Sequence, residues 1–250
     1  MTLLEKTRKI NKLLQRSETV EYDGISKVLS NVLGANVYIV SKAGDIYGYA
    51  LYDEDERSDI DAVLRKGKFS APAVRWLNHF DETEVNPPKY EGEDALPVVL
   101  KNFVVVPIYG VGRRIGTLIV ARQAKRFTDD DLLLAEYGAT VVGMEMLRDH
   151  SEKVEIEARK KATVQIALAT LSYSEAEAAI NILGELDGNE GLLVASKIAD
   201  RVGITRSVIV NALRKFESAG VIESKSLGMK GTYIKIKNEY LMEEVQKLRR

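Results

Sequence analysis

The feature that most constrains this chain is an unbroken helical pattern of about forty residues that begins near Asp131. Thr128 precedes it as a candidate N-cap, and aspartates follow in the first turn, where they favour the positive end of the helix dipole. The pattern is apolar over 132–147, charged over 148–161 and apolar again over 162–171. A helix with a charged middle predicts a linker between two domains. We therefore expect a domain at 1–147, a helical linker at 148–171 that continues the helix from about 129, and a second domain at 172–250.

The N-terminal domain mixes amphipathic helical segments with segments rich in Val and Ile. Leu3, Thr7, Ile10 and Leu14 recur at helical spacing, which predicts a helix over 3–14. The other expected elements are a helix at 26–33 ended by Gly34, hairpin strands at 36–40 and 46–51, a helix within 53–68, a loop at 81–93, and paired strands at 103–109 and 115–122. The combination of helices with antiparallel hairpins predicts an α+β fold.

The C-terminal domain begins with two overlapping Ser-x-x-Glu capping boxes at 172–177, which predict a helix start. A short helix from about Ala195 is closed by Gly203. Thr205 is expected to cap a second helix that runs to Ala219. Two helices joined through a glycine-containing turn predict a helix-turn-helix.

A β-hairpin is predicted to follow these helices. Strands at 221–225 and 232–237 flank a glycine-bracketed turn at 228–231, so Lys230 lies at the tip. A hairpin in this position is the wing of a winged helix-turn-helix, and a helical bundle with an accessory hairpin is the alternative.

Charge is distributed unevenly along the chain, although the formal net charge is only −1. The segment 191–237 holds nine Lys or Arg and three acids, which leaves it near +6 and the remainder near −7. A basic module on an acidic body suits a polyanionic partner, whereas charge alone also allows an ordinary solvated face.

The second helix indicates which side chains would meet DNA. Val208, Ile209, Ala212, Leu213 and Phe216 form its apolar stripe, so the polar residues between them face outward. Arginine and asparagine can bond purine edges bidentately, and helix N-termini bind phosphate. The predicted DNA-contacting residues are Ser196, Thr205, Arg206, Ser207, Asn211, Arg214, Lys215 and Lys230.

Several other function classes find no support. Cysteine is absent, which fits a reducing cytoplasm. The charged N-terminus and the lack of a long apolar run predict neither export nor membrane insertion, so we expect a cytoplasmic protein. His79 and His150 lie far apart, and the glycines at 110–116 have the spacing of a hairpin turn. We expect no catalytic residue, no metal site and no required cofactor.

Three stretches of the C-terminal domain resemble the CodY family of global repressors: ASKIADRVGITRS at 195–207, NALRK at 211–215 and SLGMKGT at 226–232. The similarity extends to EYGATVVGME at 136–145, LSYS at 171–174 and LLEKTR at 3–8. The resemblance implies an N-terminal GAF-like sensory domain, a long linker helix and a C-terminal winged helix-turn-helix. It further implies a homodimeric repressor that binds AT-rich promoter DNA of nutrient-responsive genes for amino-acid metabolism, stationary phase and virulence. The alternative is a GAF-domain signalling protein or nucleotide-processing enzyme whose winged helix makes protein contacts.

The resemblance also implies two effectors, a branched-chain amino acid (isoleucine, leucine or valine) and GTP. The implied amino-acid pocket comprises Tyr38, Arg57, Ile60, Val63, Phe69, Leu96, Pro97 and Val98. The position where the family carries a carboxylate-binding arginine is Asp59 here, so Arg57 is a substitute and we expect weak or absent isoleucine binding. The implied nucleotide-binding residues are Ser41, Lys42 and Glu145.

Overall fold

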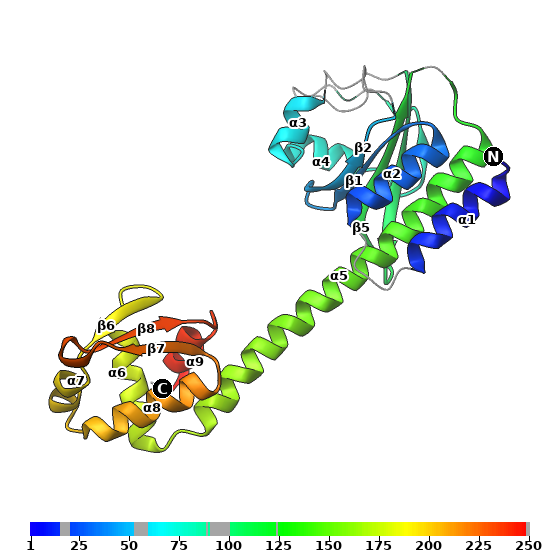
Figure 1. Cartoon of the computed structure of the whole chain (residues 1–250). Coiled ribbons are helices and arrows are strands. Elements are labelled where there is room, and N and C mark those ends of the chain that lie inside the picture. The colour runs from blue at the N-terminus through cyan, green and yellow to red at the C-terminus, as the bar shows by residue number, and fades with distance from the viewer. Residues whose placement is uncertain (16–20, 53–59, 89, 91–100, 124, 249–250) are drawn as a thin grey trace. The chain divides into compact units, whose positions relative to one another are not determined.

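The computed structural model covers the 250-residue chain and describes residues 1–15, 21–52, 60–88, 90, 101–123 and 125–248 (Figure 1). The chain divides into two compact units, Met1–His150 and Ser151–Arg250. Helix α5 (Asp129–Ala169) begins in the first unit and ends in the second, which confirms the long helix expected from the sequence. Thr128 caps it, because Asp131 N donates to Thr128 Oγ1 at 3.3 Å.

The first unit is built on a five-stranded antiparallel sheet with the order β2-β1-β5-β4-β3. The strands are β1 (Asn36–Ser41), β2 (Ile46–Ala50), β3 (Glu84–Val85), β4 (Asn102–Gly110) and β5 (Arg113–Arg122). Both predicted hairpins, β1–β2 and β4–β5, are confirmed. The loop predicted over 81–93 is wrong at β3, because β4 pairs with Glu84 and Val85 and turns them into an edge strand.

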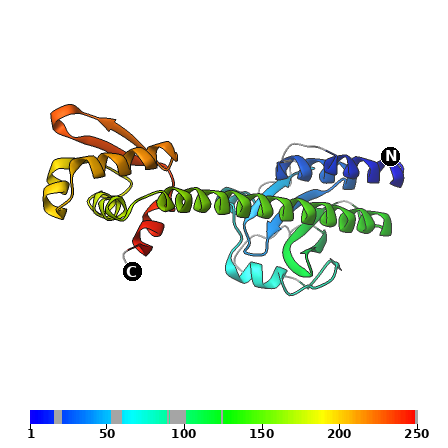
Figure 2. The same ribbon diagram turned by 90° about the horizontal axis from the view of Figure 1, so that it is seen from below.

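Helices cover both faces of this sheet (Figure 2). Helices α1 (Leu3–Leu14) and α2 (Tyr22–Leu33) and the first half of α5 pack on one face. Helices α3 (Asp61–Lys66) and α4 (Ala71–Leu77) pack on the other. Side chains of a strand alternate between faces, so Ile39 joins the first core and Tyr38 the second.

Capping residues near the helix ends explain where several helices of the first unit begin or end. Helix α2 starts four residues before the expected position and ends at Gly34, whose φ of 61° supplies the left-handed cap that the sequence predicts. Helix α3 lies inside the charged stretch where a helix was expected. Helix α4 was not anticipated, although Ser70 caps it and Pro72 stands in its first turn.

The second unit contains α6 (Tyr173–Gly184), α7 (Ala195–Val202), α8 (Arg206–Ser218) and α9 (Leu241–Lys247). Its sheet has the order β6-β8-β7, formed by β6 (Glu190–Leu193), β7 (Ile222–Ser226) and β8 (Thr232–Ile236), with the 3-10 turn η3 (Gly228–Lys230) between the last two. Helices α7 and α8 with the β7–β8 hairpin confirm the winged helix-turn-helix. Strand β6 is an addition that the sequence did not indicate.

The end of α5 belongs to the core of this second unit. Val164 and Ala167 are buried in one apolar cluster with residues of α6, α8 and the wing sheet. The opening of α6 follows the sequence prediction, because Ser172 and Glu175 form a capping box. The last turns of the long helix therefore pack as part of the C-terminal core.

Candidate nucleic-acid interface and effector region

Helix α8 buries one face and exposes the other. Ile209, Ala212, Leu213 and Phe216 are buried, and the predicted DNA-contacting residues Arg206, Ser207, Asn211 and Arg214 are exposed. Ser196 and Thr205 at the starts of α7 and α8, and Lys230 in the wing turn, are exposed as well. The predicted cap of α8 is wrong in one respect: Thr205 holds the N-cap position, but its hydroxyl pairs with that of Ser207 at 2.8 Å and accepts no bond from the helix backbone.

Ion pairs divide the cations of this unit into two groups. Seven of those that the structure describes have a carboxylate partner: Arg159 with Glu155, Lys160 with Glu239, Arg201 with Glu185, Lys215 with Glu175, Lys235 with Glu190, Lys237 with Glu223, and Lys247 with Glu243 and Glu244. Across α7, α8 and the wing, all of which the structure describes, the cations without a carboxylate partner are Lys197, Arg206, Arg214, Lys225 and Lys230. We call these five residues the free cations. Their charge is available to an external anion.

Lys215 differs from its neighbour Arg214. Its side chain is 38% exposed, and its ammonium group donates to Glu175 Oε2 at 2.6 Å and to the carbonyl oxygen of Thr170 at 2.8 Å. The Lys215 ammonium holds the pKa of the Glu175 carboxyl below its usual range. The charge of Lys215, a predicted DNA contact, is thus neutralised by Glu175 within the second unit.

The predicted effector residues that the structure describes gather in one place. Tyr38, Ile60, Val63 and Phe69 are all at most 5% exposed and share the apolar cluster between the sheet and helices α3 and α4. Trp76 packs on its edge, with ring contacts to Phe80, Tyr90 and Phe103. Arg57, Asp59, Leu96, Pro97 and Val98 lie outside the described residues.

The three residues of the implied nucleotide site lie at the end of β1 and on α5. Ser41 ends β1 and is buried, but its hydroxyl is bonded to Asp45 Oδ2 at 3.0 Å. Lys42 is exposed in the following turn. Glu145 is buried on α5 and pairs with Arg148 at 2.7 Å.

A tyrosine forms a hydrogen bond to α5 close to the last residue of the first unit. Tyr22, the first residue of α2, donates its hydroxyl to Asp149 Oδ2 at 2.5 Å, and its ring packs against Tyr47. Burial and the Asp149 carboxylate raise the pKa of Tyr22 far above its usual range. Its hydroxyl therefore remains a donor to Asp149 at neutral pH.

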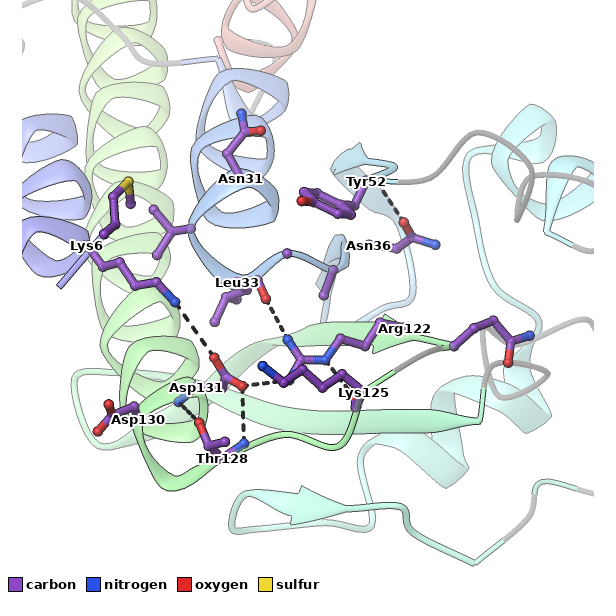
Figure 3. A pocket seen from close by; sticks show the side chains of 15 residues that line it. Lys6, Asn31, Leu33, Asn36, Tyr52, Arg122, Lys125, Thr128, Asp130 and Asp131 are labelled. Carbon is purple, nitrogen blue, oxygen red and sulfur yellow. Dashed lines mark hydrogen bonds and ion pairs between the residues drawn. The ribbon is translucent and has the colours of Figure 1, made fainter. Parts of the chain in front are cut away.

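A cavity of about 610 Å³ opens at the start of α5 (Figure 3). A buried ion pair lies at its base, because Arg122 contacts Asp131 at 2.6 Å and also donates to the carbonyl oxygen of Leu33. Lys6 approaches the same carboxylate at 3.9 Å. None of the predicted effector residues that the structure describes lines this cavity. Arg122 and Asp131 neutralise each other, and their contacts to Lys6 and Leu33 join α1, α2, β5 and α5.

Sequence reasoning missed a second buried arginine. Arg114 on β5 is 8% exposed and donates to Leu77 O at 2.9 Å, Thr117 Oγ1 at 2.8 Å and Phe80 O. Burial lowers its pKa. The carbonyl oxygens at the end of α4 are the negative end of a helix, which is where a buried cation is best placed.

Membrane spans and metal clusters are both absent from the part of the chain that the structure describes. No described helix is long and apolar enough to cross a bilayer. Among the same residues, no group of three His, Cys, Asp or Glu is placed to hold a metal ion.

Comparison with known proteins gives matches along the whole chain. A family model described as the CodY GAF-like domain matches residues 2–170, and one described as the CodY helix-turn-helix domain matches residues 189–249. Proteins named global transcriptional regulator CodY from Brevibacillus brevis and Clostridium kluyveri are each 53% identical. The matches cover 100% and 99% of this chain, respectively, and 99% of each relative. A solved structure of the cofactor-binding GAF domain of the nutrient sensor CodY from Clostridium difficile is 40% identical, with a TM-score of 0.42 over 58% of this chain and 99% of that one.

Proposed function

The chain belongs to the CodY family of transcriptional regulators, and from this premise we propose that it represses nutrient-responsive genes by binding AT-rich promoter duplexes through its winged helix-turn-helix. The observation that carries the proposal is the set of free cations on α7, α8 and the wing. When exposed cations without an internal partner neutralise DNA phosphates, the counterions condensed on the DNA are released. This release drives binding to duplex DNA.

The two helices and the wing divide this task. Helix α8 presents Arg206, Asn211 and Arg214 on its outer face, which suits a helix that enters the major groove and contacts base edges. Lys230 at the wing tip suits a contact to the flanking backbone, which adds affinity with little sequence choice.

The test is the charge reversal Arg206→Glu with Arg214→Glu. We expect loss of salt-sensitive binding to AT-rich duplexes, measured by fluorescence anisotropy. The matched control is Arg65→Glu with Lys66→Glu on α3, which changes net charge equally on exposed residues of the other unit. Unchanged affinity in the α8 variant would refute DNA binding by this surface.

We further propose that the first unit responds to a small molecule, by family precedent a branched-chain amino acid and GTP. The gathering of Tyr38, Ile60, Val63 and Phe69 supports an apolar site on the α3–α4 side of the sheet, to which Arg57, Leu96, Pro97 and Val98 would contribute. Ser41, Lys42 and Glu145 remain the proposed nucleotide residues.

Calorimetric titration tests these effectors. We expect isoleucine to bind weakly or not at all to the wild type and more tightly to Asp59→Arg, because a guanidinium would pair with the ligand carboxylate. GTP is titrated into the wild type in parallel, with Lys42→Ala as its control. If Asp59→Arg gained no affinity for isoleucine, this result would contradict the proposal that the first unit binds a branched-chain amino acid.

We also propose that the protein works as a homodimer, because one α8 reads only a half-site. Leu133 and Met144 on α5 are 52% and 54% exposed, and their spacing places them on one helix face. Sedimentation should show that Met144→Glu shifts the protein toward monomer while Val154→Glu, another exposed apolar position of α5, does not. A monomeric wild type at micromolar concentration would exclude the dimer.

A further inference from the structure

One lysine of α8 ties that helix to the junction between α5 and α6. Lys215 Nζ donates to the carbonyl oxygen of Thr170, the residue that follows α5, and to Glu175 in the first turn of α6. A single side chain therefore joins three helices at one point.

Glu175 is built into this junction. It is 7% exposed, and the oxygen that accepts from Lys215 also accepts from Ser172 N at 2.7 Å. If Lys215 turned outward to a DNA phosphate, it would leave this buried carboxylate without its counter-charge, which is unfavourable. Arg214, one residue earlier, has no such tie and is exposed.

We propose that Lys215 is a positioning residue: it fixes the C-terminal half of α8 against the α5–α6 junction, sets the orientation in which Arg206, Asn211 and Arg214 meet DNA, and touches no phosphate itself. This inference rests on the proposed DNA binding of α8. It reassigns a lysine that the sequence alone placed among the DNA contacts.

The test compares Lys215→Met with Arg214→Met, each of which removes one positive charge from α8. The dissociation constant of full-length protein for duplex DNA is measured over a range of salt concentrations. Arg214→Met should reduce the slope of log affinity against log salt by about 0.9 for each phosphate that the protein no longer neutralises. Lys215→Met should keep the wild-type slope and weaken binding roughly tenfold, the size expected for a coupled charged pair.

A second measurement separates positioning from a simple loss of folded protein. Selection from a pool of random duplexes should show a broadened sequence preference for Lys215→Met, since misaligned side chains discriminate bases poorly. A variant that is only less stable would keep the wild-type preference, and that result would overturn the inference. Glu175→Gln should reproduce Lys215→Met, the double variant should be no worse than either, and Lys215→Arg should restore the preference.

Two further results would contradict the inference. A salt slope that falls in Lys215→Met as it does in Arg214→Met would place Lys215 on a phosphate. Unchanged affinity and preference would show that the junction does not orient α8. A wild type that binds no duplex would overturn the proposed function and this inference together, whereas the other two results overturn the inference alone.

Discussion

The two units use positive charge in opposite ways. In the first unit, Arg114 is buried, the Arg122 side chain is only 12% exposed, and both donate to backbone carbonyl oxygens at the ends of helices α4 and α2. In the second, Arg206 and Arg214 are exposed and have no carboxylate partner among the residues that the structure describes. A buried guanidinium with satisfied donors holds elements together, whereas an exposed one adds little to stability and is available to a polyanion. Removing charge should therefore damage folding in one unit and binding in the other.

The largest effect on stability is expected from Arg122→Met. This change removes the nearer cation from the Asp131 carboxylate, which is 11% exposed and keeps the longer contact to Lys6 at 3.9 Å, and it leaves the carbonyl oxygens of Leu33, Lys125 and Arg126 without this donor. We expect the free energy of unfolding of the first unit to fall by about 3 kcal/mol, as for other broken buried pairs. Urea unfolding followed by tryptophan fluorescence measures it, because Trp76 is the only tryptophan and lies in that unit.

The matched control is Arg65→Met. Arg65 also pairs with an aspartate, Asp61, but its side chain is 82% exposed, so its loss should change stability by less than about 0.5 kcal/mol. An equal loss of unfolding free energy in Arg122→Met and Arg65→Met would show that buried and exposed cations contribute alike to stability, and the comparison of the two units would fail.

A smaller effect on stability is expected at the ion pair of Glu175 and Lys215, where the second unit, like the first, uses a cation to hold its elements together. The pKa of Glu175 is lowered by Lys215 in the folded state, so its contribution is present above the unfolded value of about 4.3 and is lost as pH falls through the folded value. Glu175→Gln should destabilise the second unit by roughly 1 kcal/mol near neutral pH, which is below the about 1.5–3 kcal/mol of a charged hydrogen bond because the Lys215 side chain is 38% exposed and solvent weakens the interaction. The difference from wild type should vanish in strongly acidic solution, which calorimetry checks at each pH. A difference independent of pH would mean that charge is not involved.

The sequence predicted the elements whose signals are local. The α5 cap at Thr128, the Gly34 and Gly203 helix ends and the β4–β5 pairing all follow from residues close together in the chain. The outer face of α8 followed in the same way, since its apolar stripe at helical spacing fixes which side chains are exposed.

The features that could not be predicted from the sequence depend on partners that lie far away along the chain. Strand β6 contains a glycine, shows little β propensity and forms because β8 pairs with it. Lys215 could not be separated from Arg214 by any local pattern, because its partner Glu175 lies forty residues earlier. Helix α4 is a different case, since Ser70 and Pro72 gave a start signal that a seven-residue helix made easy to overlook.

The smallest expected effect comes from comparing two hairpin turns. The wing places glycines at its positive φ angles, Gly228 at 62° and Gly231 at 112°, whereas the β4–β5 turn places Val111 at 50° before Gly112 at 72°. A β-branched residue is strained in this left-handed region, and Asn-Gly is the preferred pair for such a turn. Val111 is 85% exposed, so replacing it sacrifices no packing. Val111→Asn should raise the stability of the first unit by roughly 0.5–1 kcal/mol, measured by Trp76 fluorescence in urea. Val111→Thr keeps the branched Cβ and should give no gain, and equal stability of the two variants would show that the turn is not strained.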